Sequence, residues 1–159
     1  MVLEMNHIRF ELVPAVKPWP FTQYRIPASS SGYTGWASTD PIGSLSDLDK
    51  KNQKLDYLLK PVIRLVKYWN AWNGKVFPSF ELERTIADGT VLFSLFGPKN
   101  IKDIFYRAIE QLNTPYGLAS WRQDAVTRAK AIVRSTKLLE ASGRGDEAER
   151  AIQRLIPGG

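Results

Sequence analysis

The sequence predicts an α+β protein that is mostly helical, with short N-terminal strands followed by a helical bundle. Residues near the N-terminus alternate between apolar and polar, the period of a strand, whereas apolar residues after residue 44 recur at helical spacing. The chain has 159 residues, of which 43% are apolar and 24% charged. This size and balance are typical of one folded domain. We expect a β element over residues 1–43 and a helical domain over residues 44–159, together forming one compact unit.

Residues 7–16 (HIRFELVPAV) carry the strand pattern. Pro14 is expected to end this strand or to place it at a sheet edge. Residues 24–26 are a second short candidate strand, and the small polar residues 28–35 indicate a loop. One or two strands do not make a stable sheet, so we expect their edges to need further partners. The residues expected on the buried face of the first strand are Ile8, Phe10 and Leu12.

Helical spacing dominates the rest of the chain. Gly143 stands where a glycine commonly ends a helix, and Asp88-Gly89 is a candidate end for an earlier one. Two of the predicted helices are given by their first residues, Ser44 and Ser79, and Ser79 is also predicted to cap its helix. The other four are predicted over residues 58–72, 101–112, 118–142 and 146–156.

The helix predicted over residues 58–72 has the clearest amphipathic pattern. Lys60, Arg64 and Lys67 gather on its polar face with no acid between them, which indicates either a solvated surface or an anion contact. The residues expected on the opposite, apolar face are Leu58, Val62, Leu65, Val66, Trp69 and Trp72.

Composition excludes several classes of site. Cysteine is absent, and His7 is the single histidine, so thiolate metal sites and sites with several imidazoles are excluded. No apolar run is long enough to span a bilayer, and no signal-peptide pattern follows Met1, so we expect no membrane partner and a cytoplasmic location. The net charge of +6 favours polyanionic partners such as nucleotides or nucleic acid.

Five segments, in order and with suitable spacing, carry a resemblance to a known family. They are residues 10–16 (FELVPAV), 24–27 (YRIP), 36–41 (WASTDP), 60–70 (KPVIRLVKYWN) and 78–83 (PSFELE). The chain resembles the bacterial second-messenger nucleotidyltransferases, which are similar to cyclic GMP-AMP synthase and the oligoadenylate synthetases. The resemblance implies a polymerase-β-like sheet and the synthesis of linear or cyclic nucleotide messengers for antiviral defence.

The resemblance also assigns roles to individual residues. Three acids of the family hold two magnesium ions, and Glu11 occupies the position of the third acid, as a catalytic residue and metal ligand. Lys67 matches a lysine that contacts the phosphates of the donor nucleotide, either ATP or GTP. Ser79 matches a serine that contacts the same phosphates from the start of a helix, where free amide groups favour anions.

The sequence departs from the family at the other two acids. A Gly-Ser turn and paired acids should precede Glu11, but only ten residues do. Gly43-Ser44 with Asp47 and Asp49 imitates that motif after the third acid, and we interpret these two aspartates as helix-capping residues. Glutamate at position 11 also replaces the usual aspartate. We therefore expect the C-terminal part of a nucleotidyltransferase, beginning at an internal methionine and inactive alone.

Two alternatives stay open. The chain could be a non-catalytic remnant that binds nucleotide, RNA or a protein through an exposed sheet edge, or forms a homodimer through it. It could also be a helical domain whose resemblance to the family is incidental. Tyr33 and Trp36 are candidates for stacking on a base. The basic residues of the predicted helix over residues 118–142, interpreted by default as a solvated face, are Arg122, Arg128, Lys130, Arg134 and Lys137.

Overall fold

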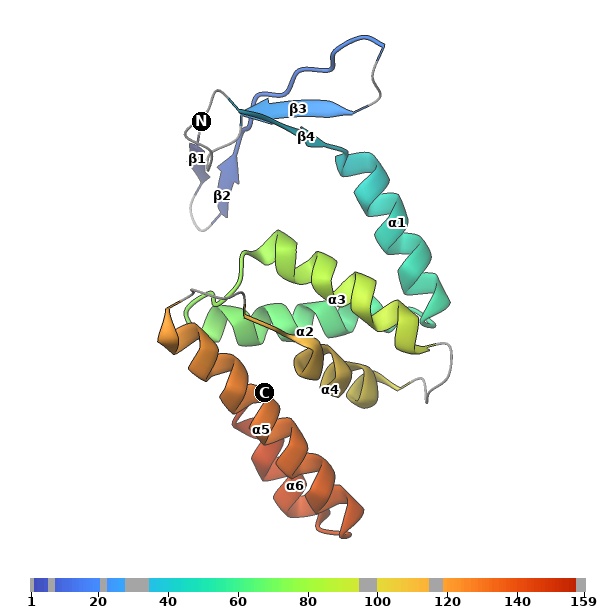
Figure 1. Cartoon of the computed structure of the whole chain (residues 1–159), viewed down its shortest axis with the longest axis vertical. Coiled ribbons are helices and arrows are strands. Elements are labelled where there is room, and N and C mark those ends of the chain that lie inside the picture. Colours follow the sequence, from blue (N-terminus) through green and yellow to red (C-terminus); the bar gives the residue numbers. More distant parts are fainter. Residues whose placement is uncertain are drawn as a thin grey trace. The chain divides into compact units, whose positions relative to one another are not determined.

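The computed structural model describes residues 2–5, 8–20, 23–27, 35–94, 100–114 and 119–156. As predicted, the protein is mostly helical with short antiparallel strands at its N-terminal side (Figure 1). The chain divides into two compact units, Met1–Asp47 and Leu48–Gly159. The division falls within the first helix.

The N-terminal unit contains two antiparallel pairs of strands. Strand β1 (Val2–Met5) pairs with β2 (Ile8–Glu11), and β3 (Tyr24–Pro27) pairs with β4 (Trp36–Thr39). The predicted strand over residues 24–26 is confirmed. The strand predicted over residues 7–16 is shorter than expected, and its position 7 lies outside the described residues. The sequence pattern missed β1 and β4, which supply the pairing partners within the chain.

Helix α1 (Pro41–Lys54) begins three residues before the predicted start at Ser44. The Asp40 carboxylate accepts a hydrogen bond of 2.9 Å from the Gly43 N–H, and Pro41 takes the first helical position, where its missing N–H costs nothing. Asp47 and Asp49 therefore lie inside the helix, and their interpretation as capping residues was wrong.

A tight turn separates α1 from α2 (Leu59–Trp72). Asp56 and Tyr57 both have left-handed backbone conformations, with φ of 51° and 64°. Such conformations are costly for residues other than glycine, so neighbouring contacts must hold them. Leu55 and Leu59 flank the turn and are completely buried in the core of the helical unit.

Helix α2 supplies the centre of that core. Val62, Val66 and Trp69 are buried, as the amphipathic pattern predicts. Trp72 is not: 66% of its surface is exposed, which corrects the predicted apolar face. It is the last residue of α2, and its ring stacks on Tyr68 with centroids 6.4 Å apart.

Helix α3 (Ser79–Ser94) continues through Asp88-Gly89, so the predicted helix end there was wrong. The side chain of Gln111, at the end of α4 (Ile101–Gln111), lies over this glycine: a Cβ at Gly89 would be 2.2 Å from the Gln111 Oε1 atom, so a larger residue would require that side chain to shift. Helices α2, α3 and α4 pack against one another (Figure 1).

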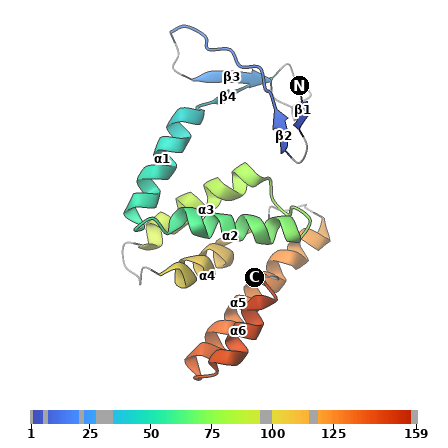
Figure 2. The same ribbon diagram turned by 180° about the vertical axis from the view of Figure 1, so that it is seen from behind.

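The last two helices form an antiparallel pair that is visible from both sides (Figures 1 and 2). Helix α5 (Ser120–Ala141) ends where predicted, with Gly143 at φ 74°. The Gly143 and Arg144 N–H groups donate to the Glu140 and Leu139 carbonyls, which satisfies the helix end before α6 (Gly145–Gln153) begins. No helix in the described ranges is long and apolar enough to cross a membrane.

Candidate functional site

The connection between α2 and α3 is held by one buried amide. Asn70 is 4% exposed, and its Nδ2 atom donates to the Phe77 carbonyl at 2.9 Å. The Phe77 N–H donates back to the Asn70 Oδ1 atom, also at 2.9 Å. Since both backbone groups of Phe77 are satisfied by one side chain, the segment from Gly74 to Pro78 is fixed against the end of α2.

This connection walls a groove with a volume of about 440 Å³. Lys67 and Ser79, the two residues predicted to contact phosphate, both line it. They come from different helices, α2 and α3, so the fold and not the sequence spacing alone brings them to one opening. The remaining lining residues are Asn70, Ala71, Lys75, Phe77, Pro78 and Arg122.

Lys67 has a partner that the helical pattern did not reveal. Its ammonium forms an ion pair with the carboxylate of Glu83, one turn into α3. The two side chains are 33% and 27% exposed, so both are partly withdrawn from water. The polar face of α2 has no acidic residue among its cations, and the carboxylate that pairs with Lys67 is supplied by the neighbouring helix α3. Lys60 is likewise paired, with Asp49 at 2.5 Å.

Two further cations line the groove. Lys75 follows Gly74 in a left-handed turn, with φ of 59° and 77° for the two residues. Arg122, from the first turn of α5, also lies over the ring of Trp121 at 5.2 Å. Neither Lys75 nor Arg122 forms an ion pair with the residues that the structure describes. No sequence pattern pointed to Lys75, and Arg122 was interpreted as part of a solvated helix face.

Ser79 lies at the N-terminus of α3 but does not cap it. The Pro78 carbonyl accepts from the Leu82 N–H at 3.0 Å, so Pro78 occupies the cap position and Ser79 the first helical position. The amide groups of the first turn of a helix lack partners within the helix. With the exposed Ser79 hydroxyl, they give this end of the groove hydrogen-bond donors and a partial positive charge.

Glu11, the predicted metal ligand, is the last residue of β2 in the N-terminal unit, where its backbone is paired with Val2. Its side chain lies outside the described residues. Within the described part of the chain, no three histidine, cysteine, aspartate or glutamate side chains gather in a way that could hold a metal ion. Glu83 is the carboxylate beside the groove lysine, and an ammonium already engages it. The described residues alone therefore do not fit the expected magnesium site.

The remaining predicted residues are distributed as follows. Trp36 begins β4 and is about half exposed, whereas Tyr33 and His7 lie outside the described residues. Arg64 is exposed on α2 and does not line the groove.

The fold and the groove together define a mostly helical α+β protein with a cationic groove at a helix N-terminus. No protein-family model matches the sequence, and a comparison with characterised proteins finds no match.

Proposed function

We propose that the groove between α2 and α3 binds the triphosphate of ATP or GTP, as the C-terminal part of a second-messenger nucleotidyltransferase would. The observation that carries this proposal is that Lys67 and Ser79 line one groove together with Lys75 and Arg122. Three cations and the end of a helix dipole surround a volume suited to a polyphosphate, with Glu83 as the acid paired to one of the cations.

Each residue would act on the phosphates in a different way. Lys75 would supply a mobile point charge, and the guanidinium of Arg122 can contact two phosphate oxygens at once. Lys67 would exchange its carboxylate partner for a phosphate oxygen. The Ser79 hydroxyl would donate a hydrogen bond beside the free amides of α3.

Magnesium belongs to the proposal only as the ion that accompanies a nucleoside triphosphate. Glu11 is the proposed protein ligand, and it would need two further acids that the resemblance places N-terminal to it. We therefore propose binding of nucleotide by this chain and no catalytic step.

The test is a calorimetric titration with ATP, GTP and inorganic triphosphate, at low salt, with and without magnesium. We expect all three to bind to the wild-type protein. Lys67→Ala should weaken binding about tenfold, the effect of losing one charge-assisted hydrogen bond. Arg64→Ala is the matched control, because Arg64 is a cation of the same helix that does not line the groove.

Equal losses in Lys67→Ala and Arg64→Ala would show that binding follows net charge alone and would reject the groove. Absence of triphosphate binding by the wild-type protein would reject it as well. A nucleotide affinity much higher than the affinity for inorganic triphosphate would indicate that the protein also contacts the nucleoside.

A second proposal concerns the strands. Each sheet has only two strands, so each described strand pairs with a neighbour along one edge and leaves its other edge open. The exception is β3, whose Arg25 also forms a single β-bridge with Val16. Open edges favour association with another chain. A homodimer, or an RNA or protein partner bound at such an edge, would appear in light scattering as a mass above 18.0 kDa.

A further inference from the structure

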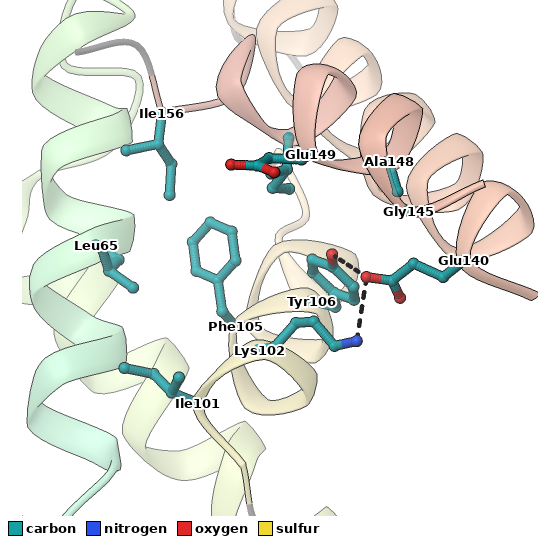
Figure 3. Close-up of a pocket in the computed structure, with 11 residues that line it drawn as sticks. Leu65, Ile101, Lys102, Phe105, Tyr106, Glu140, Gly145, Ala148, Glu149 and Ile156 are labelled. Atoms are coloured by element: carbon teal, nitrogen blue, oxygen red, sulfur yellow. Dashed lines mark hydrogen bonds and ion pairs between the residues drawn. The ribbon is translucent and has the colours of Figure 1, made fainter. Parts of the chain in front are cut away.

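A second cavity lies elsewhere in the helical unit. It results from the way in which the last three helices, α4, α5 and α6, pack. Helix α5 packs against both α4 and α6, whereas the described residues of α4 and α6 make no close backbone approach to each other. The two helices lie apart, and a cleft of about 310 Å³ lies between them, with α2 at its side (Figure 3). This volume is at the lower end of the range for small-molecule sites.

The floor of the cleft is apolar. Its hydrophobic lining comes from three regions far apart in the sequence: α2, α4, and α6 with the residues directly after it. The apolar lining residues are Leu65, Ile101, Phe105, Ala148, Ile152 and Ile156. A surface of this kind, concave and made of branched and aromatic side chains, binds apolar groups by removing them from water.

The rim of the cleft is acidic. Glu140 accepts hydrogen bonds from the Tyr106 hydroxyl at 3.2 Å and from the Lys102 ammonium at 3.1 Å. Glu149 forms no ion pair or hydrogen bond with any described residue, and Figure 3 shows its carboxylate projecting from α6 toward the open space that faces Phe105. Two carboxylates and one ammonium leave the rim with one uncompensated negative charge.

These two properties together select a ligand class. An uncharged apolar ligand would fill the floor but would partly desolvate the Glu149 carboxylate without offering it a partner, which is unfavourable. An anionic ligand would add like-charge repulsion. A ligand with an apolar body and one ammonium group fills the floor and pairs with Glu149.

We propose that the cleft between α4 and α6 is a binding site for a small amphipathic cation, a hydrophobic ammonium compound whose head pairs with Glu149. The site is independent of the nucleotide groove, because the two openings share no lining residue and take opposite charges. Failure of either proposal leaves the other intact.

The test uses three probes of equal chain length: octylammonium, 1-octanol and octanoate, each below its micelle concentration. Amide NMR shifts are recorded on the isotope-labelled full chain. We expect octylammonium to bind tightest and octanoate weakest, with the largest shifts at Tyr106, Gly145 and Ile152. Equal affinities for the three probes, or shifts concentrated elsewhere, would overturn the proposal. Concentration-dependent dimerisation that abolishes probe binding would assign the cleft to a second copy of the chain and would also overturn it.

Glu149→Gln tests the head-group contact. It should weaken octylammonium about fivefold, the effect of one partly exposed ion pair, and should leave 1-octanol unchanged within about twofold. Glu81→Gln is the matched control, because Glu81 is an exposed helical glutamate outside the cleft. An unchanged octylammonium affinity in Glu149→Gln would reject the ammonium contact.

Gly145→Phe tests the location. A Cβ at Gly145 meets no atom within 4 Å, so the new ring has room to enter the cleft from its edge. We expect loss of octylammonium binding with an unchanged circular-dichroism spectrum. Retained binding in this folded variant would move the site elsewhere. Should Gly145→Phe fail to fold, the Glu149→Gln comparison still decides the proposal.

Discussion

The groove and the cleft are two openings on the same helical unit, built in opposite ways. The groove is lined mainly by one continuous stretch, from Lys67 to Ser79, and by cations. The cleft is lined by segments from α2 to Ile156, after the end of α6, and its floor is apolar with an acidic rim. Because the groove is nearly local in sequence, a motif could point to it. Nothing in the sequence pattern indicated the cleft, which depends on how far apart two helices distant in the sequence lie.

The two openings should also differ in what maintains their walls: hydrogen bonds in the groove and apolar packing in the cleft. The largest expected effect is therefore that of Asn70→Leu. This change removes both hydrogen bonds to Phe77 and leaves its backbone N–H and carbonyl without their partners. We expect a loss of about 3 kcal/mol in the free energy of unfolding, measured by urea denaturation.

Asn73→Ala is the control for Asn70→Leu. Among the described residues, Asn73 makes a single side-chain hydrogen bond, from its Nδ2 atom to the Trp69 carbonyl at 2.8 Å. Its loss should cost about 1 kcal/mol or less. Similar costs for the two variants would mean that Asn70 does not hold the groove wall.

The cleft also has a polar contact, the hydrogen bond from the Tyr106 hydroxyl to Glu140, and its contribution to stability depends on pH. Burial, reinforced by the charge and hydrogen bond of Glu140, raises the pKa of Tyr106 to about 12. The neutral hydroxyl is favoured in the folded state, so its contribution to stability is complete below the ordinary pKa of about 10 and is lost as the pH rises toward 12. We expect the wild-type protein to lose on the order of 2 kcal/mol across this window relative to Tyr106→Phe.

Denaturation of both proteins between about pH 9 and about pH 12 measures this difference. The two proteins differ only by the hydroxyl of Tyr106, so the difference between their curves reports on that group. Parallel curves would show that the hydroxyl of Tyr106 titrates alike in the folded and unfolded chains.

The smallest expected effect is at the open edge of the cleft. Gly145→Ala should stabilise the protein by about 0.5 kcal/mol, because alanine restricts the unfolded chain and its methyl group meets no neighbour. Gly143→Ala should instead destabilise by about 1 kcal/mol, since its φ of 74° disfavours any residue with a Cβ. Thermal unfolding measures both, and a destabilising Gly145→Ala would contradict an open cleft.

The helices were largely predictable because their patterns are local. The amphipathic repeat located α2 and the burial of Val62, Val66 and Trp69, and Gly143 located the end of α5. Periodicity failed for Trp72, since the last residue of a helix can extend beyond the elements that cover its apolar face. It failed at Gly89 because a single glycine does not end a helix whose neighbouring residues continue it, and the sequence does not show that the Gln111 side chain lies over this position.

The strands and the groove's electrostatics were less predictable, for a common reason. The strands β1 and β4 are recognisable only through the partners they pair with. Similarly, the partners of Lys60 and Lys67 come from α1 and α3, so inspection of α2 alone could not identify them. Both the strand pairing and these ion pairs depend on residues far apart in the sequence, so a short sequence window cannot predict them.

If the groove binds phosphate as proposed, the ion pair between Lys67 and Glu83 limits which anions it would hold. A bound anion must displace a carboxylate that is tethered beside its ammonium and is therefore present at a high local concentration. Chloride or acetate, with one charge, gains little from that exchange. A polyphosphate would engage several cations at once and could displace the carboxylate, so in the proposed site the protein's own acid would discriminate among anions by valence.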